Sequence, residues 1–404
     1  MALDTSSFAA GLKVHYTDQT VRNMVYKDNP FFALCPKYEK FGGKNLPIPL
    51  IYGNPQGRSA TFATAQANKG STKIKDFTLT RVSDYSLASI SNEAILASQG
   101  DVNAFMEAAV TEIDGAINSL ARSTAVAMFR NGSGSIGQVA NSSFTTTALT
   151  LTVVEDVTHF EVGMVLVLNN TDDATSVESG TLTVSGVDRV QGIVTTTQNL
   201  STGVGTVAQN DYIFVQGDPG LKLSGIDAWL VDPSVLTSAT FFGLDRTADA
   251  SRLAGLYSDG SAKPIEEALI DAASLAAREG GKVDTCFVDY KQYSNLSKAL
   301  GSKVQYIDKM VGGEVEISFR GISLAGPRGM IDVIPDQNCK ANTGFMLQLD
   351  TWKLYSLGKS PQILDMDGLK MLRESTADNV EVRVGAYHQL GCQAPGWNCK
   401  IKLA

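Results

Sequence analysis

Three histidines are the residues of this chain whose type is best suited to catalysis or metal binding. His15, His159 and His388 lie in three separate segments. Zinc sites need clustered histidine, cysteine or carboxylate ligands, and a Ser-His-Asp site needs a histidine beside its nucleophile. The spacing shows neither arrangement. We interpret His388, in a strand-like run near Cys392, as a partly exposed strand residue.

A glycine-rich turn, GSGSIG at residues 132–137, has the GxGxxG spacing of a dinucleotide-binding loop. That loop needs a strand before it and a helix after it, so that phosphates meet a helix N-terminus. Here a long helical pattern precedes the turn and strand-like residues follow it. GVGTVA at 203–208 fails for the same reason, and no GxxxxGK[ST] is present. We expect no nucleotide cofactor.

Two acidic motifs also have simple structural explanations. Asp365 and Asp367 precede Gly368 as in a calcium loop, but the later glutamate of such a loop is missing, so a turn is expected. Glu266 and Glu267 stand at the start of a predicted helix, where the helix dipole favours them. We therefore expect no metal and no other cofactor, no catalytic residue and a protein that is not an enzyme.

The cysteines predict free thiols. Their number is odd, their spacings are wide, and no CxxC occurs. The N-terminal run MALDTSSFAAGLKVHYTDQ lacks a basic start followed by an apolar core. We therefore expect no secretory signal and expect the protein to be made and to act in a cytoplasm. The five cysteines are Cys35, Cys286, Cys339, Cys392 and Cys399.

Composition indicates a globular chain of several domains without a nucleic-acid-binding face. The 404 residues are 43% hydrophobic and 19% charged, and the net charge is −8. We see no basic patch of the kind that binds phosphates and no run of about 20 apolar residues that would span a membrane. Residues 131–216 contain a single basic residue, Arg189, against eight acids.

The same acidic segment is the clearest all-β region. The run TTTALTLTVVEDVTHFEVGMVLVLNN at 145–170 alternates β-branched and polar residues. Strands are predicted near 148–154, 162–168, 180–186, 190–197 and 211–215. We expect an inserted all-β domain over 131–217.

A long helix precedes this domain. Apolar residues recur at helical spacing through 101–130, with Asp101 as a candidate N-cap. About 30 residues give a rod of roughly 45 Å. The predicted face carries Phe105, Ala109, Ile113, Ile117, Leu120 and Met128.

The N-terminal third reads as an arm followed by a projection. Within the arm, residues 1–43, a short helix is expected at 17–26 and an extended segment at NPFFALCPKYEKFGGK. Residues 44–96 predict two strands joined by a long, weakly apolar tip. Pro47 and Pro49 restrict the first strand to an edge. A long two-stranded projection is not stable alone, so it needs a partner surface.

The remaining chain predicts an α/β body over 218–340 and further strands over 341–404. Helices are expected at PIEEALIDAASLAAREGG and at YKQYSNLSKAL, the second capped by Asp289. KVDTCFVD, EVEISF and MIDVIPD are predicted strands. GFMLQLDTWKLYSL is predicted as strand-like, and 379–403 as two strands around a Pro-Gly turn.

This order of elements resembles the major capsid proteins of tailed bacteriophages, which have the HK97-like fold. The resemblance rests on NPFFALCPKYEKFGGKNLPIPL, the loop through 59–80, the helix after Asp101, PIEEALIDAASLAAREGG and the C-terminal run EVRVGAYHQLGCQAPGWNCKIKL. It implies an α+β fold with an N-terminal arm (1–43), an extended loop (44–96), a spine helix (97–130), an axial domain (218–340) and peripheral strands (341–404). The β domain is similar to insertion domains that lie on the outer surface of some capsids.

The resemblance also implies a function and partners. The chain would be a structural subunit that forms hexamers and pentamers in an icosahedral head around double-stranded DNA, assembled in a bacterial cytoplasm. Scaffolding, portal and decoration proteins are the implied partners. The expected assembly contacts are Phe31, Phe32, Pro55, Arg58, Phe62, Lys73, Lys75 and Arg81.

Some members of that family crosslink a loop lysine to an asparagine. Lys69, Lys73 and Lys75 with Asn379 and Asn398 are interpreted here as ordinary surface and turn residues. Two other functions remain open: a phage tail or adhesin protein, and an α/β enzyme with a β lid.

Overall fold

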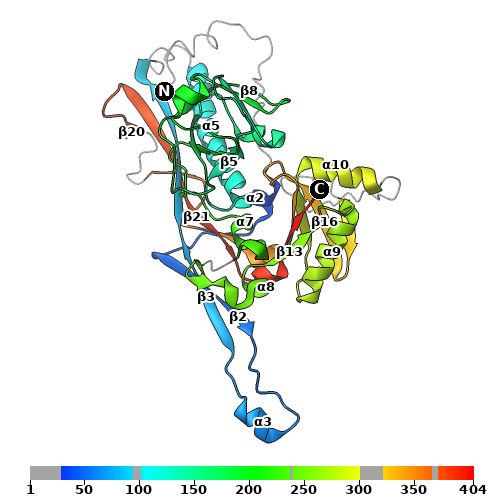
Figure 1. Cartoon of the computed structure of the whole chain (residues 1–404). Coiled ribbons are helices and arrows are strands. Elements are labelled where there is room, and N and C mark those ends of the chain that lie inside the picture. Colours follow the sequence, from blue (N-terminus) through cyan, green and yellow to red (C-terminus); the bar gives the residue numbers. More distant parts are fainter. Residues whose placement is uncertain (1–28, 94–101, 237–239, 301–321, 366–371) are drawn as a thin grey trace.

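The computed structural model describes residues 29–93, 102–236, 240–300, 322–365 and 372–404, and only the backbone for 102–111. Within these residues the fold is mixed α+β (Figure 1). A hairpin projects from one end, and the long helix α5 (Val102–Phe129) runs through the opposite half. No helix in the described ranges is long and apolar enough to cross a membrane.

The longest strand, β21 (Asn379–Cys392), organises the first sheet. One edge pairs antiparallel with β4 (Val82–Ser91), from Asn379↔Ser91 to His388↔Val82. The other edge pairs with β18 (Trp352–Ser356). Helix α5 covers one face of this sheet with a small apolar core. The shorter strands are β1 (Lys37–Tyr38), β19 (Gln362–Ile363) and β20 (Leu372–Arg373).

Residues 135–215 form a separate six-stranded sheet with its own core. The strand order is β5-β10-β7-β8-β9-β6. The two end strands also meet: Val139 bridges Leu151, and Thr152 N–H donates to the carbonyl of Gln138 at 2.9 Å. The sheet is therefore closed into a small barrel, which leaves no free edge along this seam. Its strands are β5 (Ser135–Gln138), β6 (Ala148–Thr150), β7 (Val165–Asn169), β8 (Leu182–Asp188), β9 (Ile193–Thr196) and β10 (Tyr212–Val215).

The body contains a third sheet, in the order β13-β22-β17-β14-β16-β15. Helix α9 (Ile265–Arg278) packs on it through alanines, and α10 (Tyr290–Leu300) follows β14. Asp289 caps α10, as predicted, by accepting from Gln292 N–H at 2.6 Å. The strands are β13 (Leu256–Asp259), β14 (Thr285–Val288), β15 (Ile322–Gly326), β16 (Gly329–Pro335), β17 (Thr343–Leu347) and β22 (Cys399–Lys402).

One large core joins the first and third sheets to the N-terminal segment. Phe31 is fully buried, with ring centroids 5.2 Å from Phe129 and 5.1 Å from Phe287. Its backbone N–H donates to the buried Asp336 at 3.1 Å. The short helix α2 (Pro30–Leu34) thus fixes the chain start of the described part to the body.

Several local predictions differ from the structure. The segment predicted as extended contains helix α2, and SIGQ, predicted as part of a turn, is strand β5. Tertiary partners decide both cases: Phe31 packs into the core, and β5 completes the barrel. The predicted helix at 17–26, the N-cap Asp101 and the strand EVEISF lie outside the described residues.

Two predicted single strands are each divided between sheets. TKIKDFTLTRVSDYSLASI becomes β3 (Lys73–Thr80), in the hairpin, and β4, in the first sheet. GFMLQLDTWKLYSL becomes β17 in the body sheet and β18 in the first sheet. Likewise, β21 and β22 follow one another but belong to different sheets. The C-terminal strands therefore link two sheets rather than forming one unit.

The barrel should fold alone, and its closure by β5 makes this testable. A fragment of residues 131–217 is expected to give dispersed amide signals by NMR, because it retains the whole core and the closing seam. A fragment of residues 140–217 lacks β5 and should lose that dispersion. Undispersed spectra from the longer fragment would contradict an independent barrel.

Candidate assembly surfaces

The projecting hairpin consists of β2 (Asn45–Gly53) and β3. In the described part of the chain each strand pairs only with the other. Pro47 and Pro49 have no N–H to donate, so they suit strand β2, which has a free edge. A short helix, α3 (Phe62–Ala67), forms the far end (Figure 1). The predicted two-stranded projection is therefore present, and its tip is partly helical.

The base of the hairpin is anchored in the large core. Phe77 is fully buried, and its ring centroid lies 4.9 Å from that of Trp229. Ile48 and Leu79 reach Gly391 of β21 so closely that a Cβ there would lie 2.9 and 2.8 Å from their methyl groups. This packing fixes the direction in which the hairpin leaves the body.

The outer half of the hairpin exposes apolar side chains. Phe62 is 82% exposed, and the cross-strand partners Ile51 and Ile74 are 64% and 60% exposed. Basic residues surround them: residues 44–80 carry five Lys or Arg and one acid, a net charge of +4. Large apolar side chains with a polar rim are typical of protein interfaces. The basic residues are Lys44, Arg58, Lys69, Lys73 and Lys75, and the acid is Asp76.

A second exposed apolar surface lies on the first sheet. Tyr85 and Leu87 of β4 are 52% and 58% exposed. Since side chains alternate along a strand, they point away from the face that carries the buried Ala88 and Ile90. The ring of Tyr387 meets that of Tyr85 edge to face, with centroids 5.9 Å apart. We call these three residues, Tyr85, Leu87 and Tyr387, the sheet patch.

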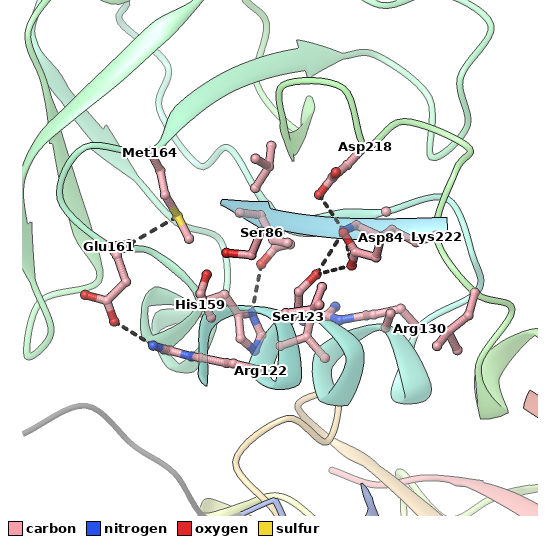
Figure 2. A pocket seen from close by; sticks show the side chains of 18 of the residues that line it. Asp84, Ser86, Arg122, Ser123, Arg130, His159, Glu161, Met164, Asp218 and Lys222 are labelled. Atoms are coloured by element: carbon pink, nitrogen blue, oxygen red, sulfur yellow. Dashed lines mark hydrogen bonds and ion pairs between the residues drawn. The ribbon is translucent and has the colours of Figure 1, made fainter. Parts of the chain in front are cut away.

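Ion pairs attach the barrel to α5 (Figure 2). Arg122 lies 2.6 Å from Glu161, and this pair is drawn in Figure 2. Arg130, directly after α5, lies 2.7 Å from Asp156. Burial opposes the charge on Arg130, but Asp156 outweighs burial and raises the pKa of this guanidinium. Removing one member of so buried a pair costs about 3–5 kcal/mol, because the other charge remains without a partner.

A third group of charges joins β4 to the segment after the barrel. Lys222 Nζ lies 2.7 Å from Asp84 and 3.2 Å from Asp218, and it donates to Ser123 Oγ at 2.8 Å (Figure 2). Burial raises the pKa of Asp218. The barrel is thus attached where the chain enters it and where the chain leaves it.

Of the three histidines, the described His159 lies in the barrel and His388 in the first sheet, and His15 lies outside the described residues. His388 is buried rather than partly exposed: it lies on β21 between β4 and β18, and its Nδ1 is 2.8 Å from Ser360 Oγ. Burial lowers the pKa of His388 and of His159 to about 4. The five cysteines are free, as predicted, and all five are buried. The described residues contain no group of three potential metal ligands.

The structure separates the eight predicted contact residues into two groups. Pro55, Arg58, Phe62 and Lys73 are exposed on the hairpin, and Lys75 is partly exposed beside Tyr52. Phe31 is buried in the core of its own chain, which corrects its assignment as a contact with a neighbour.

Two further predicted contacts are partly used within the chain. Arg81 donates to the carbonyl of Phe41 at 2.5 Å and stacks on its ring. Phe32 is half-buried under Lys37. The sequence prediction did not name the exposed apolar residues Ile51 and Ile74 or the residues of the sheet patch. Side chains alternate between the two faces of a strand, and this pattern does not show which face the rest of the chain leaves exposed.

Comparisons with known proteins support the resemblance. The family described as SU10 major capsid protein matches residues 191–369. Among solved structures, the capsid asymmetric unit of cyanophage A-1(L) matches with a TM-score of 0.58 and 12% identity, covering 98% of this chain and 99% of that one. The capsid of a native GTA particle matches with a TM-score of 0.50 and 10% identity over 100% of both chains. No curated protein matches the sequence.

The chain is similar to the major capsid proteins of tailed phages. At these identities the solved structures show the fold alone, and the family match covers less than half of the chain. The resemblance predicted from the sequence is therefore confirmed, and the findings support a structural capsid subunit of a phage head. They point to a structural role rather than an enzymatic one.

The two buried histidines predict a pH-dependent stability. Each has a folded pKa of about 4, whereas an unfolded histidine titrates near 6.5, so the unfolded state binds more protons between these values. The contribution of each neutral buried histidine to the free energy of unfolding is fully present above pH 6.5 and is lost as the pH falls towards 4. At pH 5 each histidine should lower the free energy of unfolding by about 2 kcal/mol.

Urea unfolding at pH 7 and pH 5 measures this loss. His388→Asn retains an acceptor for Ser360 but does not titrate, so its loss between the two pH values should be smaller by about 2 kcal/mol. Tyr387→Phe is the control and should behave as the unaltered protein. Because burial raises the pKa of Asp218 and Asp336, which acts in the opposite sense, the comparison of variants is the decisive quantity. Equal losses in His388→Asn and the control would contradict the prediction.

Proposed function

We propose that this chain is the major capsid subunit of a tailed phage, and that it assembles into an icosahedral head around double-stranded DNA. One observation carries the proposal. The hairpin buries its base but exposes Phe62, Ile51 and Ile74 on its outer half. In a monomer, three large apolar side chains on an extended projection would stay exposed to water, which is unfavourable. A shell subunit buries them against a neighbour.

The parts of the fold then have specific roles. The hairpin β2–β3 is the extended loop, α5 is the spine helix, and the sheet around β21 belongs to the peripheral domain. The body sheet is the axial domain, near the centre of a hexamer or pentamer. The barrel is an insertion domain on the outer surface.

The sheet patch of a second copy is our proposed acceptor for the hairpin. Tyr85, Leu87 and Tyr387 offer an aromatic and aliphatic surface to the tip. Arg383 lies opposite Leu87 in the same sheet and is paired with Glu381. The exposed acids Glu93 and Asp378 lie beyond the far end of this strand pair, so the proposed contact rests on the apolar residues of the sheet patch.

The acidic chain should not bind DNA sequence-specifically. Its net charge of −8 opposes binding to phosphates, and we assign the basic residues of the hairpin to the contact between subunits. We propose assembly in a bacterial cytoplasm, with scaffolding, portal and decoration proteins as partners.

Substitution of the hairpin tip tests the proposal. Phe62→Ala should leave the free energy of unfolding of the subunit within about 0.5 kcal/mol, because the side chain is exposed. A truncated interface anchor typically costs about 2 kcal/mol per contact, which corresponds to roughly a 30-fold weaker association. Electron microscopy and light scattering should therefore show particles only at much higher protein concentration.

Val190→Ala is the matched control. Val190 is 88% exposed on the barrel and has no role in the proposed contact. It should assemble as the unaltered protein does. If Phe62→Ala and Val190→Ala assemble at the same concentration, the hairpin tip is not an assembly contact.

A further inference from the structure

A cavity of about 380 Å³ lies where the barrel meets α5 and β4 (Figure 2). A volume of this size is within the range of small-molecule sites. Much of its wall is apolar and comes from α5, from the barrel and from the segment that follows the barrel. The apolar residues are Leu120, Val126, Ile136, Met164, Val215 and Leu223.

The charged groups in the wall already have partners. Arg122 is paired with Glu161, and Lys222 is held by Asp84 and Asp218. A charged ligand would have to separate one of these pairs or lose its own hydration without compensation, and both are costly. The cavity therefore favours a neutral ligand.

Two residues of the same wall, His159 and Arg130, each carry a fully buried polar atom, Nε2 and Nε, that lacks a hydrogen-bond partner among the described residues. His159 and Arg130 are only 6% and 9% exposed. His159 Nδ1 lies 3.0 Å from the carbonyl of Ile136. A carbonyl only accepts, so Nδ1 carries the hydrogen and Nε2 is an acceptor. Arg130 Nε can only donate, because every nitrogen of a guanidinium carries hydrogen. Nη2 of the same group is already paired with Asp156.

We propose that this cavity binds a small neutral molecule with an apolar body and one hydroxyl group. A hydroxyl both donates and accepts, so it matches one unpartnered atom of each kind: it donates to His159 Nε2 and accepts from Arg130 Nε. The apolar body lies against the aliphatic wall. A bound molecule contacts α5 and the barrel together, so it stabilises their junction by mass action.

Phenol and toluene are matched probes for this site. They have nearly the same size and shape and differ in one hydroxyl, and toluene is the more hydrophobic. A purely apolar cavity would therefore prefer toluene. The full-length protein, labelled with ¹³C at its methionine methyl groups, reports binding through Met164 in the wall, and Met164→Leu assigns that signal.

We expect a saturable shift of the Met164 signal with phenol, at a dissociation constant at least tenfold below that for toluene. Val126→Phe fills the cavity and should abolish the shift for both probes. His159→Phe removes the acceptor and should remove the preference for phenol. Val190→Ala, away from the cavity, should bind both probes as the unaltered protein does.

Two results overturn the proposal. One is the lack of a saturable shift with either probe. The other is binding of toluene as tight as that of phenol, which would mean that the polar atoms take no part. The comparison of the two probes on the unaltered protein decides the matter even if His159→Phe does not fold. None of these outcomes depends on whether the chain assembles.

Discussion

A two-stranded hairpin that leaves the body of a protein cannot bury both of its faces by itself, and this constraint governs the molecule. The core fixes the base: Phe77 packs against Trp229, and Gly391 allows the hairpin to approach β21 closely. The outer half has no such support, yet it carries Phe62 and a row of basic residues. The buried base orients the hairpin, and we propose that the exposed part supplies a contact that a second subunit completes.

The rest of the fold keeps this projection rigid relative to the body. Strand β21 pairs with β4, which follows the hairpin directly, so the hairpin and the first sheet are one continuous structure. Phe31 and Asp336 join the N-terminal segment to the body sheet. The barrel has its own core and meets α5 through paired charges and a cavity, so it is attached to the spine of the subunit without sharing its core.

The sequence predicts features that depend on local patterns. The long helix follows from its periodicity, the free hairpin edge from Pro47 and Pro49, and the free thiols from cysteine spacing. It does not reveal features that distant partners create. Phe31 is helical and buried because Phe129 and Phe287 surround it. Of the residues that we propose as contacts, those on the hairpin follow from the sequence pattern, whereas the sheet patch depends on which face of the sheet α5 covers.

A cryo-electron microscopy reconstruction of particles assembled from the full-length chain tests the central claim most directly. The account predicts a closed shell in which the hairpin of each subunit lies against another copy. Phe62 should be buried there, with Tyr85 and Leu87 of that copy within contact distance. A shell whose hairpin tips extend into solvent, or whose contacts are all made by other surfaces, would contradict it.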